Sequence, residues 1–181
     1  MRKVKLFTAV TLDGYIARPD GNLDWLNALG DPEGADYGYG ALMASIDTVI
    51  MGRATYQEVL GFGVEWPYST CDSLIVSSNP DLDTPTERTR RVACDAELFG
   101  KMKMESGKDI WLVGGGKLVQ FFLDHGLIDE MILSVTPIVL GEGIPLFPSP
   151  TKETSFELTH SESYANGIVN LEYKLASKQG Q

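Results

Sequence analysis

Cysteine and histidine are scarce in this sequence, with two of each among 181 residues. Cys71 and Cys94 form no CxxC pair, and no pair of histidines lies near either of them. This pattern excludes the ligand spacing of common zinc sites. We therefore expect no bound metal and two free thiols in a reducing cytoplasm, with a single disulfide as the alternative.

Basic clusters and long apolar runs are also missing. The chain has 15 lysines and arginines against 25 aspartates and glutamates, a net charge of −10. Nucleic-acid binding requires clustered cations that neutralise phosphates, so nucleic acid is not an expected partner. No stretch reaches the roughly 18 consecutive apolar residues of a membrane span. The N-terminus alternates and then reaches Asp13-Gly14, unlike a signal peptide, so we expect a cytoplasmic protein without a membrane contact.

The composition is that of a folded domain. Apolar residues make up 43% of the chain, and a chain of this length buries a large core. We expect residues 1–176 to form a single domain and residues 177–181 to form a short tail.

Short apolar runs alternate with helix-like segments along the first two thirds of the chain. The runs are 3–11, 48–51, 73–76 and 110–113, and the helix-like segments are 36–45, 53–60, 95–106 and 117–125. Continuous apolar runs are typical of parallel strands that are buried on both faces. The alternation therefore predicts an α/β fold with helices on both faces of the sheet.

The last third of the chain has a different pattern. Strand signals occupy 130–140, 155–164 and 168–175, and Asn166-Gly167 separates the last two. Asn-Gly between two strands is a strong signal for a two-residue hairpin. We therefore predict a twisted mixed sheet of about eight strands that ends in an antiparallel hairpin.

Two predicted strands end in glycine and run directly into a helix. After the first comes Gly52-Arg53-Ala54-Thr55, and after the second comes Gly114-Gly115-Gly116-Lys117. A helix N-terminus presents free N–H groups to an anion, and Arg53 adds a guanidinium suited to phosphate. Three glycines exceed the needs of a turn, so a ligand or another backbone is expected against them. Glycine turns are also common in α/β folds without any ligand.

Two weaker site signals follow the same logic. Ser77 and Ser78 follow another strand and can either donate to a phosphate or cap the turn before Pro80. Asp36 precedes a helix-like segment, so it is either the N-cap or a candidate catalytic carboxylate that anchors or protonates a substrate. Its neighbours are mostly apolar, and burial among them would raise its pKa.

Aromatic and apolar residues in predicted loops suggest self-association. Trp25, Trp66 and the stretch 144–148 are hard to bury within one domain. We therefore expect a homodimer.

Four motifs in this order resemble the dihydrofolate reductase-like superfamily, and in particular the RibD C-terminal reductase domain of riboflavin biosynthesis. They are Leu12-Asp13-Gly14-Tyr15-Ile16-Ala17, Met51-Gly52-Arg53-Ala54-Thr55-Tyr56, Val113-Gly114-Gly115-Gly116, and Val139-Leu140-Gly141-Glu142-Gly143-Ile144-Pro145-Leu146-Phe147. The resemblance covers nearly the whole chain. The basic cluster that the riboflavin branch uses for its substrate's ribose phosphate is not found.

This resemblance implies NADPH as the cofactor and assigns a place to each candidate residue. Ala9 and Ile16 would contact the nicotinamide, and Asp36 would stand at the position of the acidic substrate anchor. The implied phosphate contacts are Gly52, Arg53 and Thr55 on the adenosine side, Ser77 and Ser78 at the 2′-phosphate, and Gly114, Gly115, Gly116 and Lys117 at the diphosphate.

The implied activity is hydride transfer from NADPH to a C=N or C=O bond of a pyrimidine- or pteridine-type heterocycle. The first expectation is a 5-amino-6-(5-phosphoribosylamino)uracil reductase-like enzyme, and dihydrofolate reductase is the enzymatic alternative. A nucleotide-binding module without turnover is the alternative from another class.

Overall fold

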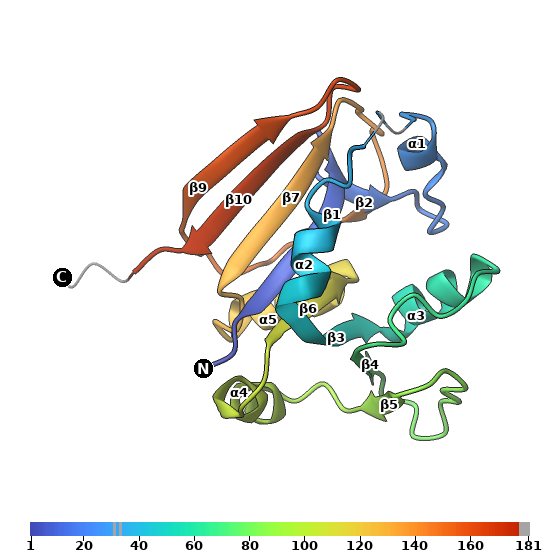
Figure 1. Cartoon of the computed structure of the whole chain (residues 1–181), viewed down its shortest axis with the longest axis vertical. Helices are drawn as coiled ribbons and strands as arrows, with labels where there is room; N and C mark the ends of the chain where they lie inside the picture. Colours follow the sequence, from blue (N-terminus) through green and yellow to red (C-terminus); the bar gives the residue numbers. More distant parts are fainter. Residues whose placement is uncertain (31, 33, 178–181) are drawn as a thin grey trace.

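An eight-stranded mixed sheet forms the centre of the folded protein in the computed structural model (Figure 1). The structure describes residues 1–30, 32 and 34–177. The strands of this sheet are β1 (Val4–Thr11), β3 (Ile46–Gly52), β4 (Asp72–Val76), β5 (Thr89–Val92), β6 (Asp109–Gly114), β7 (Glu130–Thr136), β9 (Phe156–Ser163) and β10 (Val169–Leu175). Their order across the sheet is β5-β4-β3-β6-β1-β7-β10-β9.

The sheet is parallel from β5 through β7 and antiparallel beyond it. The pairs β5–β4, β4–β3, β3–β6, β6–β1 and β1–β7 are parallel, whereas β10 pairs antiparallel with both β7 and β9. The predicted mixed sheet with a C-terminal antiparallel hairpin is therefore confirmed. The carboxyl ends of the parallel strands meet at one edge, which is where open α/β sheets bind ligands.

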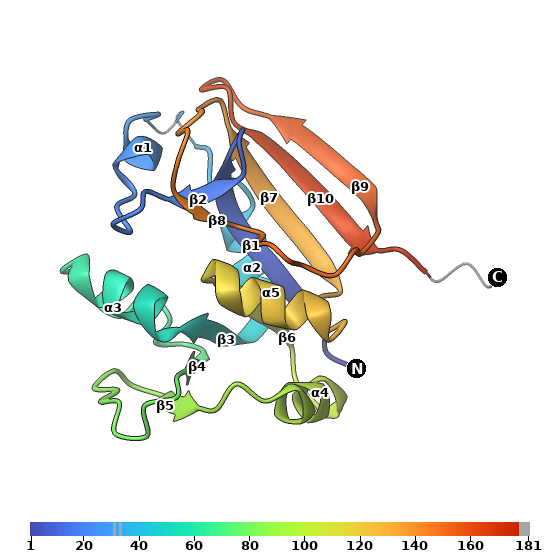
Figure 2. The ribbon, with the colours of Figure 1, turned by 180° about the vertical axis from the view of Figure 1, so that it is seen from behind.

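Helices cover both faces of the sheet, as predicted. They are α1 (Asp24–Asn27), α2 (Tyr39–Ser45), α3 (Arg53–Gly61), α4 (Ala96–Met104) and α5 (Gly116–Asp124). Phe99 of α4 and Phe122 of α5 belong to one core cluster, and Leu42 of α2 and Tyr56 of α3 belong to a second. Helix α2 lies in front of the sheet in Figure 1, and α5 lies in front of it in the view from behind in Figure 2.

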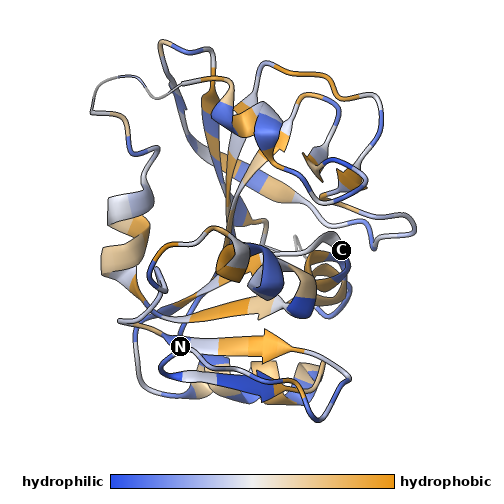
Figure 3. Cartoon of the chain, turned by 90° about the vertical axis from the view of Figure 1, so that its right-hand side faces the viewer, coloured by the Kyte–Doolittle hydropathy of each residue, from blue (hydrophilic) through white to orange (hydrophobic). Residues whose placement is uncertain are grey.

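The hydropathy pattern explains why these segments take these forms. Val49, Ile50 and Met51 of β3 are fully buried, because helices cover both sides of this strand. Helix α4 begins after Asp95, whose carboxylate accepts a hydrogen bond from the Glu97 N–H at 2.9 Å, as expected of an N-cap. Figure 3 shows the apolar residues gathered in the strands and on the helices that pack against them.

Several element boundaries differ from the sequence prediction for local reasons. Strand β7 ends at Thr136 and not at residue 140, because Pro137 has no N–H for the ladder. The hairpin loop has three residues, Ala165–Gly167, since the Tyr164 N–H donates to the Ile168 carbonyl at 2.8 Å. Gly167 takes the left-handed conformation there, with φ of 85°.

Besides the short helix α1, two strand pairings were not predicted. Strand β5 has the polar sequence Thr-Arg-Arg-Val and pairs with β4 at the edge of the sheet. A separate two-stranded sheet joins β2 (Tyr15–Ala17) to β8 (Ile144–Pro145). Neither has a long apolar run, so neither produced a strand signal.

Cys71 and Cys94 are free thiols. Within the described ranges, no helix is long and apolar enough to cross a membrane. Of the predicted tail 177–181, residues 178–181 lie outside the described residues.

Candidate functional site

A cleft of about 1240 Å³ lies at the carboxyl ends of the parallel strands. This volume exceeds the roughly 300–1,000 Å³ of a single small-molecule site, so the cleft has room for a cofactor and a substrate together. Its lining includes Ala9, Ile16, Asp36, Gly52, Arg53, Thr55, Gly114, Gly115, Gly116 and Lys117. These predicted site residues come from distant parts of the sequence, and the fold brings them together.

The junction between β3 and α3 leaves open space where a side chain would be. Gly52 has φ of −75° and ψ of 159°, values that any residue adopts, so the turn itself does not require glycine. A Cβ at this position would meet no atom within 4 Å. Gly52 therefore matters for the space it leaves in the cleft and not for a tight turn. The first N–H groups of α3 follow directly.

The junction between β6 and α5 uses its three glycines in two ways. Gly114 and Gly115 have φ of 145° and 93°, conformations that residues with a Cβ rarely adopt. Gly116 permits a close approach, because a Cβ there would lie 2.2 Å from the Pro145 carbonyl oxygen. We expected another backbone or a ligand against these glycines, and the backbone of Pro145 lies against Gly116.

The two junctions are neighbours across the cleft. A Cβ on Gly115 would lie 3.4 Å from the Thr55 hydroxyl oxygen, which is ordinary contact distance. The N-termini of α3 and α5 therefore open onto the same space. Paired helix N-termini at one cavity are suited to a ligand with more than one phosphate.

We expect Gly116→Ala to destabilise the protein by about 1–3 kcal/mol, because the new methyl group would clash with the backbone of β8. Gly100→Ala, inside α4 and with no atom within 4 Å of its Cβ position, is the matched control. That substitution should raise stability by about 0.5–1 kcal/mol through helix propensity alone. Thermal unfolding of both variants measures the difference, and equal melting temperatures would contradict the close packing of Gly116.

Charge is unevenly distributed around the cleft. Among the described lining residues the cations are Arg53 and Lys117, which stand at the starts of α3 and α5. Neither forms an ion pair with a described residue. The acidic lining residues are Asp20, Asp36 and Glu58. The positive end of the cleft therefore coincides with the glycine junctions.

Ser77 and Ser78 stand at the end of β4 but are not among the residues that line the cleft. The Ser77 hydroxyl accepts from the Asn79 N–H at 3.1 Å, which is the turn chemistry offered as its alternative role. Sequence reasoning missed Arg91, whose Nε donates to the Ser77 carbonyl at 2.9 Å and holds a guanidinium beside the serine pair.

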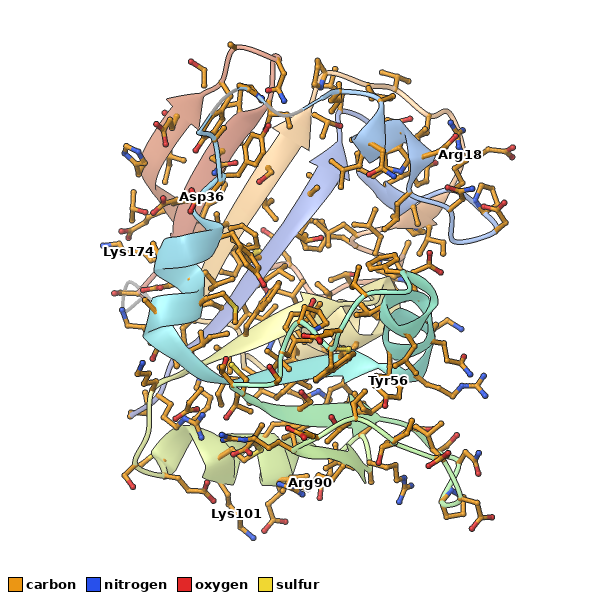
Figure 4. All side chains as sticks on the ribbon, turned by 45° about the vertical axis from the view of Figure 1, so that its right-hand side comes forward. Arg18, Asp36, Tyr56, Arg90, Lys101 and Lys174 are labelled. Atoms are coloured by element: carbon orange, nitrogen blue, oxygen red, sulfur yellow. The ribbon has the colours of Figure 1, made fainter. Side chains whose placement is uncertain are left out.

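Asp36 lines the opposite end of the cleft, beside the start of α2 (Figure 4). Asp36 is not at the N-cap position, which Gly38 occupies, although its carboxylate accepts one N–H from the first turn of α2. Its two carboxylate oxygens instead accept from the Gly38 N–H at 3.0 Å and the Gly40 N–H at 2.9 Å. The carboxyl is exposed, and these backbone donors lower its pKa below the usual value. The burial that would have raised the pKa is absent, so Asp36 is ionised near neutral pH.

Aromatic side chains form one wall of the cleft. Trp111 lies edge-on to Tyr39 with ring centroids 5.9 Å apart, and to Tyr68 with centroids 5.4 Å apart. Burial raises the pKa of Tyr68, so its hydroxyl stays neutral. Such a wall suits a flat, uncharged ring.

The two tryptophans that were expected to be hard to bury pack against other side chains of the same domain. Trp25 is 3% exposed and lines the cleft, and Trp66 packs between Tyr56 and Tyr68. Sequence reasoning also missed Tyr37, Ser134 and Ile168 as lining residues. Strand alternation could have marked Ser134 as a polar residue on a buried face, but no local signal indicates that this face borders a cleft.

No group of three or more histidine, cysteine, aspartate or glutamate side chains in the described part of the chain could hold a metal ion.

Comparison with known proteins gives consistent results. The family model described as the RibD C-terminal domain matches residues 69–170. The uncharacterized protein YwjB of Bacillus subtilis (strain 168) is 38% identical over 168 residues, covering 92% of this chain and 95% of that protein. A crystal structure of a protein from Shewanella sp. PV-4 assigned to riboflavin biosynthesis has a TM-score of 0.85 and 32% identity, covering 97% of this chain and 99% of the other.

The fold has a wider relationship. Dihydrofolate reductase from Enterococcus faecalis, solved with NADP(H), superposes with a TM-score of 0.69 at 16% identity, over 97% of both chains. At that identity the likeness concerns the fold, which is dihydrofolate reductase-like. With the family match and these relatives, the chain belongs to the RibD C-terminal domain family, a family of the reductase type.

Proposed function

We propose that this protein is an NADPH-dependent reductase that transfers a hydride to a C=N or C=O bond of a pyrimidine- or pteridine-type heterocycle. The observation that carries the proposal is the pair of helix N-termini, with Arg53 and Lys117, opening onto one cleft. A dinucleotide cofactor carries phosphates that suit this cationic end and a flat nicotinamide ring that suits the aromatic wall.

The residues present fit this cofactor. Gly52 and Gly114 leave open space at the edge of the sheet, and the N–H groups of α3 and α5 are free to donate to phosphates. Ala9 and Ile16 line the cleft and would lie against the nicotinamide. The cofactor supplies the hydride, while the protein orients both rings and excludes water from the transfer.

Two substrate classes are candidates. The family supports a substrate like 5-amino-6-(5-phosphoribosylamino)uracil, named for a Thermotoga maritima protein of the same fold. A specific observation favours the second candidate, an unphosphorylated pteridine. Among described lining residues outside the two helix junctions, the charged groups are the acidic Asp20, Asp36 and Glu58, with no cation to receive a substrate phosphate.

A substrate panel tests the proposal directly. NADPH oxidation is followed at saturating cofactor with phosphoribosyl-aminouracil, its dephosphorylated form, and a dihydropteridine. Turnover with any of them supports the reductase, and the preferred member decides between the two substrate classes. Tight NADPH binding without oxidation across all three would instead favour a nucleotide-binding module.

We also propose that the protein is a homodimer, and among the residues first expected at the contact it is the stretch 144–148 that supports it. Trp25 is buried and Trp66 is partly buried against neighbouring side chains, whereas Val139, Ile144 and Phe147 are 67%, 36% and 42% exposed within one segment. Apolar groups gathered in this way are typical of protein contacts. Light scattering at micromolar concentration should report twice the 19.8 kDa chain mass. A particle of single-chain mass would contradict the dimer, and Phe147→Ser should weaken it if this segment is the contact.

A further inference from the structure

The C-terminal hairpin is attached to the segment that precedes α2. The amide Nδ2 of Asn166 donates to the Gly30 carbonyl at 3.0 Å and to the Tyr37 hydroxyl at 2.7 Å. An asparagine amide has two donor hydrogens, so both are used. A single side chain at the hairpin tip therefore contacts two points that lie more than a hundred residues earlier in the chain.

A second asparagine reaches the same segment from inside the sheet. Asn170 of β10 is 4% exposed, and its Nδ2 donates to the Tyr37 carbonyl at 2.7 Å. Its Oδ1 accepts from the Ser134 hydroxyl of β7 at 2.7 Å. Because the oxygen is occupied by a hydroxyl donor, the amide nitrogen is directed at the Tyr37 carbonyl.

Tyr37 has an unusual backbone. Its φ is 52°, in the left-handed region that residues with a Cβ avoid unless their surroundings impose it. Each asparagine donates one hydrogen bond to Tyr37, Asn170 to its carbonyl and Asn166 to its hydroxyl. Its ring also packs edge-on against Tyr164 of the hairpin, with centroids 4.7 Å apart. The hairpin thus holds this residue at three points.

The conformation of Tyr37 affects the preceding residue, Asp36. Asp36 lines the cleft, and its carboxylate receives the N–H groups of Gly38 and Gly40 only because the chain reverses at Tyr37 and Gly38. We propose that Asn166 and Asn170 are positioning residues that hold Tyr37 in its left-handed conformation and so fix the Asp36 carboxylate at the substrate end of the cleft. This assignment rests on the proposed function for its catalytic meaning, but the geometry of Asp36 can be measured without any substrate.

The test is Asn170→Asp, which keeps the size of the side chain and removes both donor hydrogens. Hydrogen exchange at the Gly38 and Gly40 amides should become about tenfold faster, the loss expected for one weakened hydrogen-bonded turn. The pKa of Asp36, followed by NMR, should rise toward its ordinary value as its two backbone donors leave. Turnover should fall while NADPH affinity stays within about twofold, because the cofactor contacts lie at the other end of the cleft.

Two further variants keep the test decisive. Asn166→Asp removes the two hydrogen bonds that the Asn166 amide donates to Gly30 and Tyr37. This variant replaces Asn170→Asp in the test if Asn170→Asp does not fold. Ser161→Asp adds the same charge to β9 at a solvent-exposed position and should leave Asp36 unchanged. Unchanged Asp36 pKa and unchanged Gly38 and Gly40 exchange in a folded asparagine variant would overturn the proposal. Failure of NADPH to bind would overturn the proposed function alone, since these two measurements need no ligand.

Discussion

Replacing Asp36 by asparagine is expected to lower kcat/KM about 100-fold, the largest effect of any substitution considered for this cleft. A hydrogen bond to a charged group contributes roughly 1.5–3 kcal/mol, and its loss in the transition state appears directly in kcat/KM. NADPH affinity should not change, because Asp36 lies away from the two helix junctions. The melting temperature should fall modestly, since Gly38 and Gly40 donate to separate carboxylate oxygens and the amide oxygen can replace only one of them.

Asp20→Asn is the matched control for this experiment, because Asp20 also lines the cleft and its replacement removes the same charge. Turnover that falls equally in both variants would indicate a general electrostatic effect. Asp36 would then have only a structural role in the turn before α2.

The pH dependence distinguishes the possible roles of Asp36. Its pKa is lowered by backbone hydrogen bonds from Gly38 and Gly40, so the carboxylate form predominates at neutral pH. We therefore expect kcat/KM to stay constant as the pH falls from 7 to about 4, the usual pKa of aspartate, with loss only below it. A carboxyl that donated the proton would need a raised pKa, and activity would fall on the alkaline side.

The lowered pKa of Asp36 also stabilises the folded state above about pH 4, and this contribution is lost as the pH falls through the folded-state pKa.

Arg53→Ala is expected to weaken NADPH binding about 10- to 100-fold and to leave NADH binding nearly unchanged. The guanidinium stands at the start of α3, where no described carboxylate forms an ion pair with it, and the other described cation of the cleft is Lys117. A charge-assisted contact to the 2′-phosphate contributes roughly 1.5–3 kcal/mol, which only the phosphorylated cofactor can use. Calorimetric titration of both cofactors measures the ratio.

Arg90→Ala provides the control for net charge, since Arg90 is exposed on β5 at the far side of the molecule from Asp36 (Figure 4). Equal affinity of the unmodified protein for NADPH and NADH would contradict a 2′-phosphate pocket. If Arg53→Ala retains the preference, Arg91→Ala is the next variant, because Arg91 is held beside Ser77 and Ser78.

The elements that could be predicted from the sequence are those whose signal is local. Buried strands such as β3 are continuous apolar runs, and Asn166-Gly167 marks a hairpin within a few residues. Gly116 could be identified as a point of close approach because three consecutive glycines exceed what a turn requires. The two glycine junctions of the candidate site were found because at each of them an apolar run ends in glycine and a helix-like segment follows directly.

The parts that could not be predicted depend on partners far away in the chain. Polar β5 is a strand because β4 offers it an edge, and β8 pairs with β2 only once the fold has brought them together. Asp36 was expected at an N-cap, which is the ordinary position for an aspartate before a helix. The left-handed turn at Tyr37 that moves it depends on Asn170, which no local pattern connects to it.

The amino-acid sequence thus determined the fold class, the buried strands, the longer helices and the glycine-rich strand ends, because each follows from hydrophobic periodicity or backbone freedom within a few residues. Only the tertiary structure decided which side chains share the cleft, that its two cations stand at the glycine junctions, and that Asp36 is exposed and ionised. These properties depend on distances between segments and on the resulting burial and hydrogen bonding, which arise only when the sheet has formed.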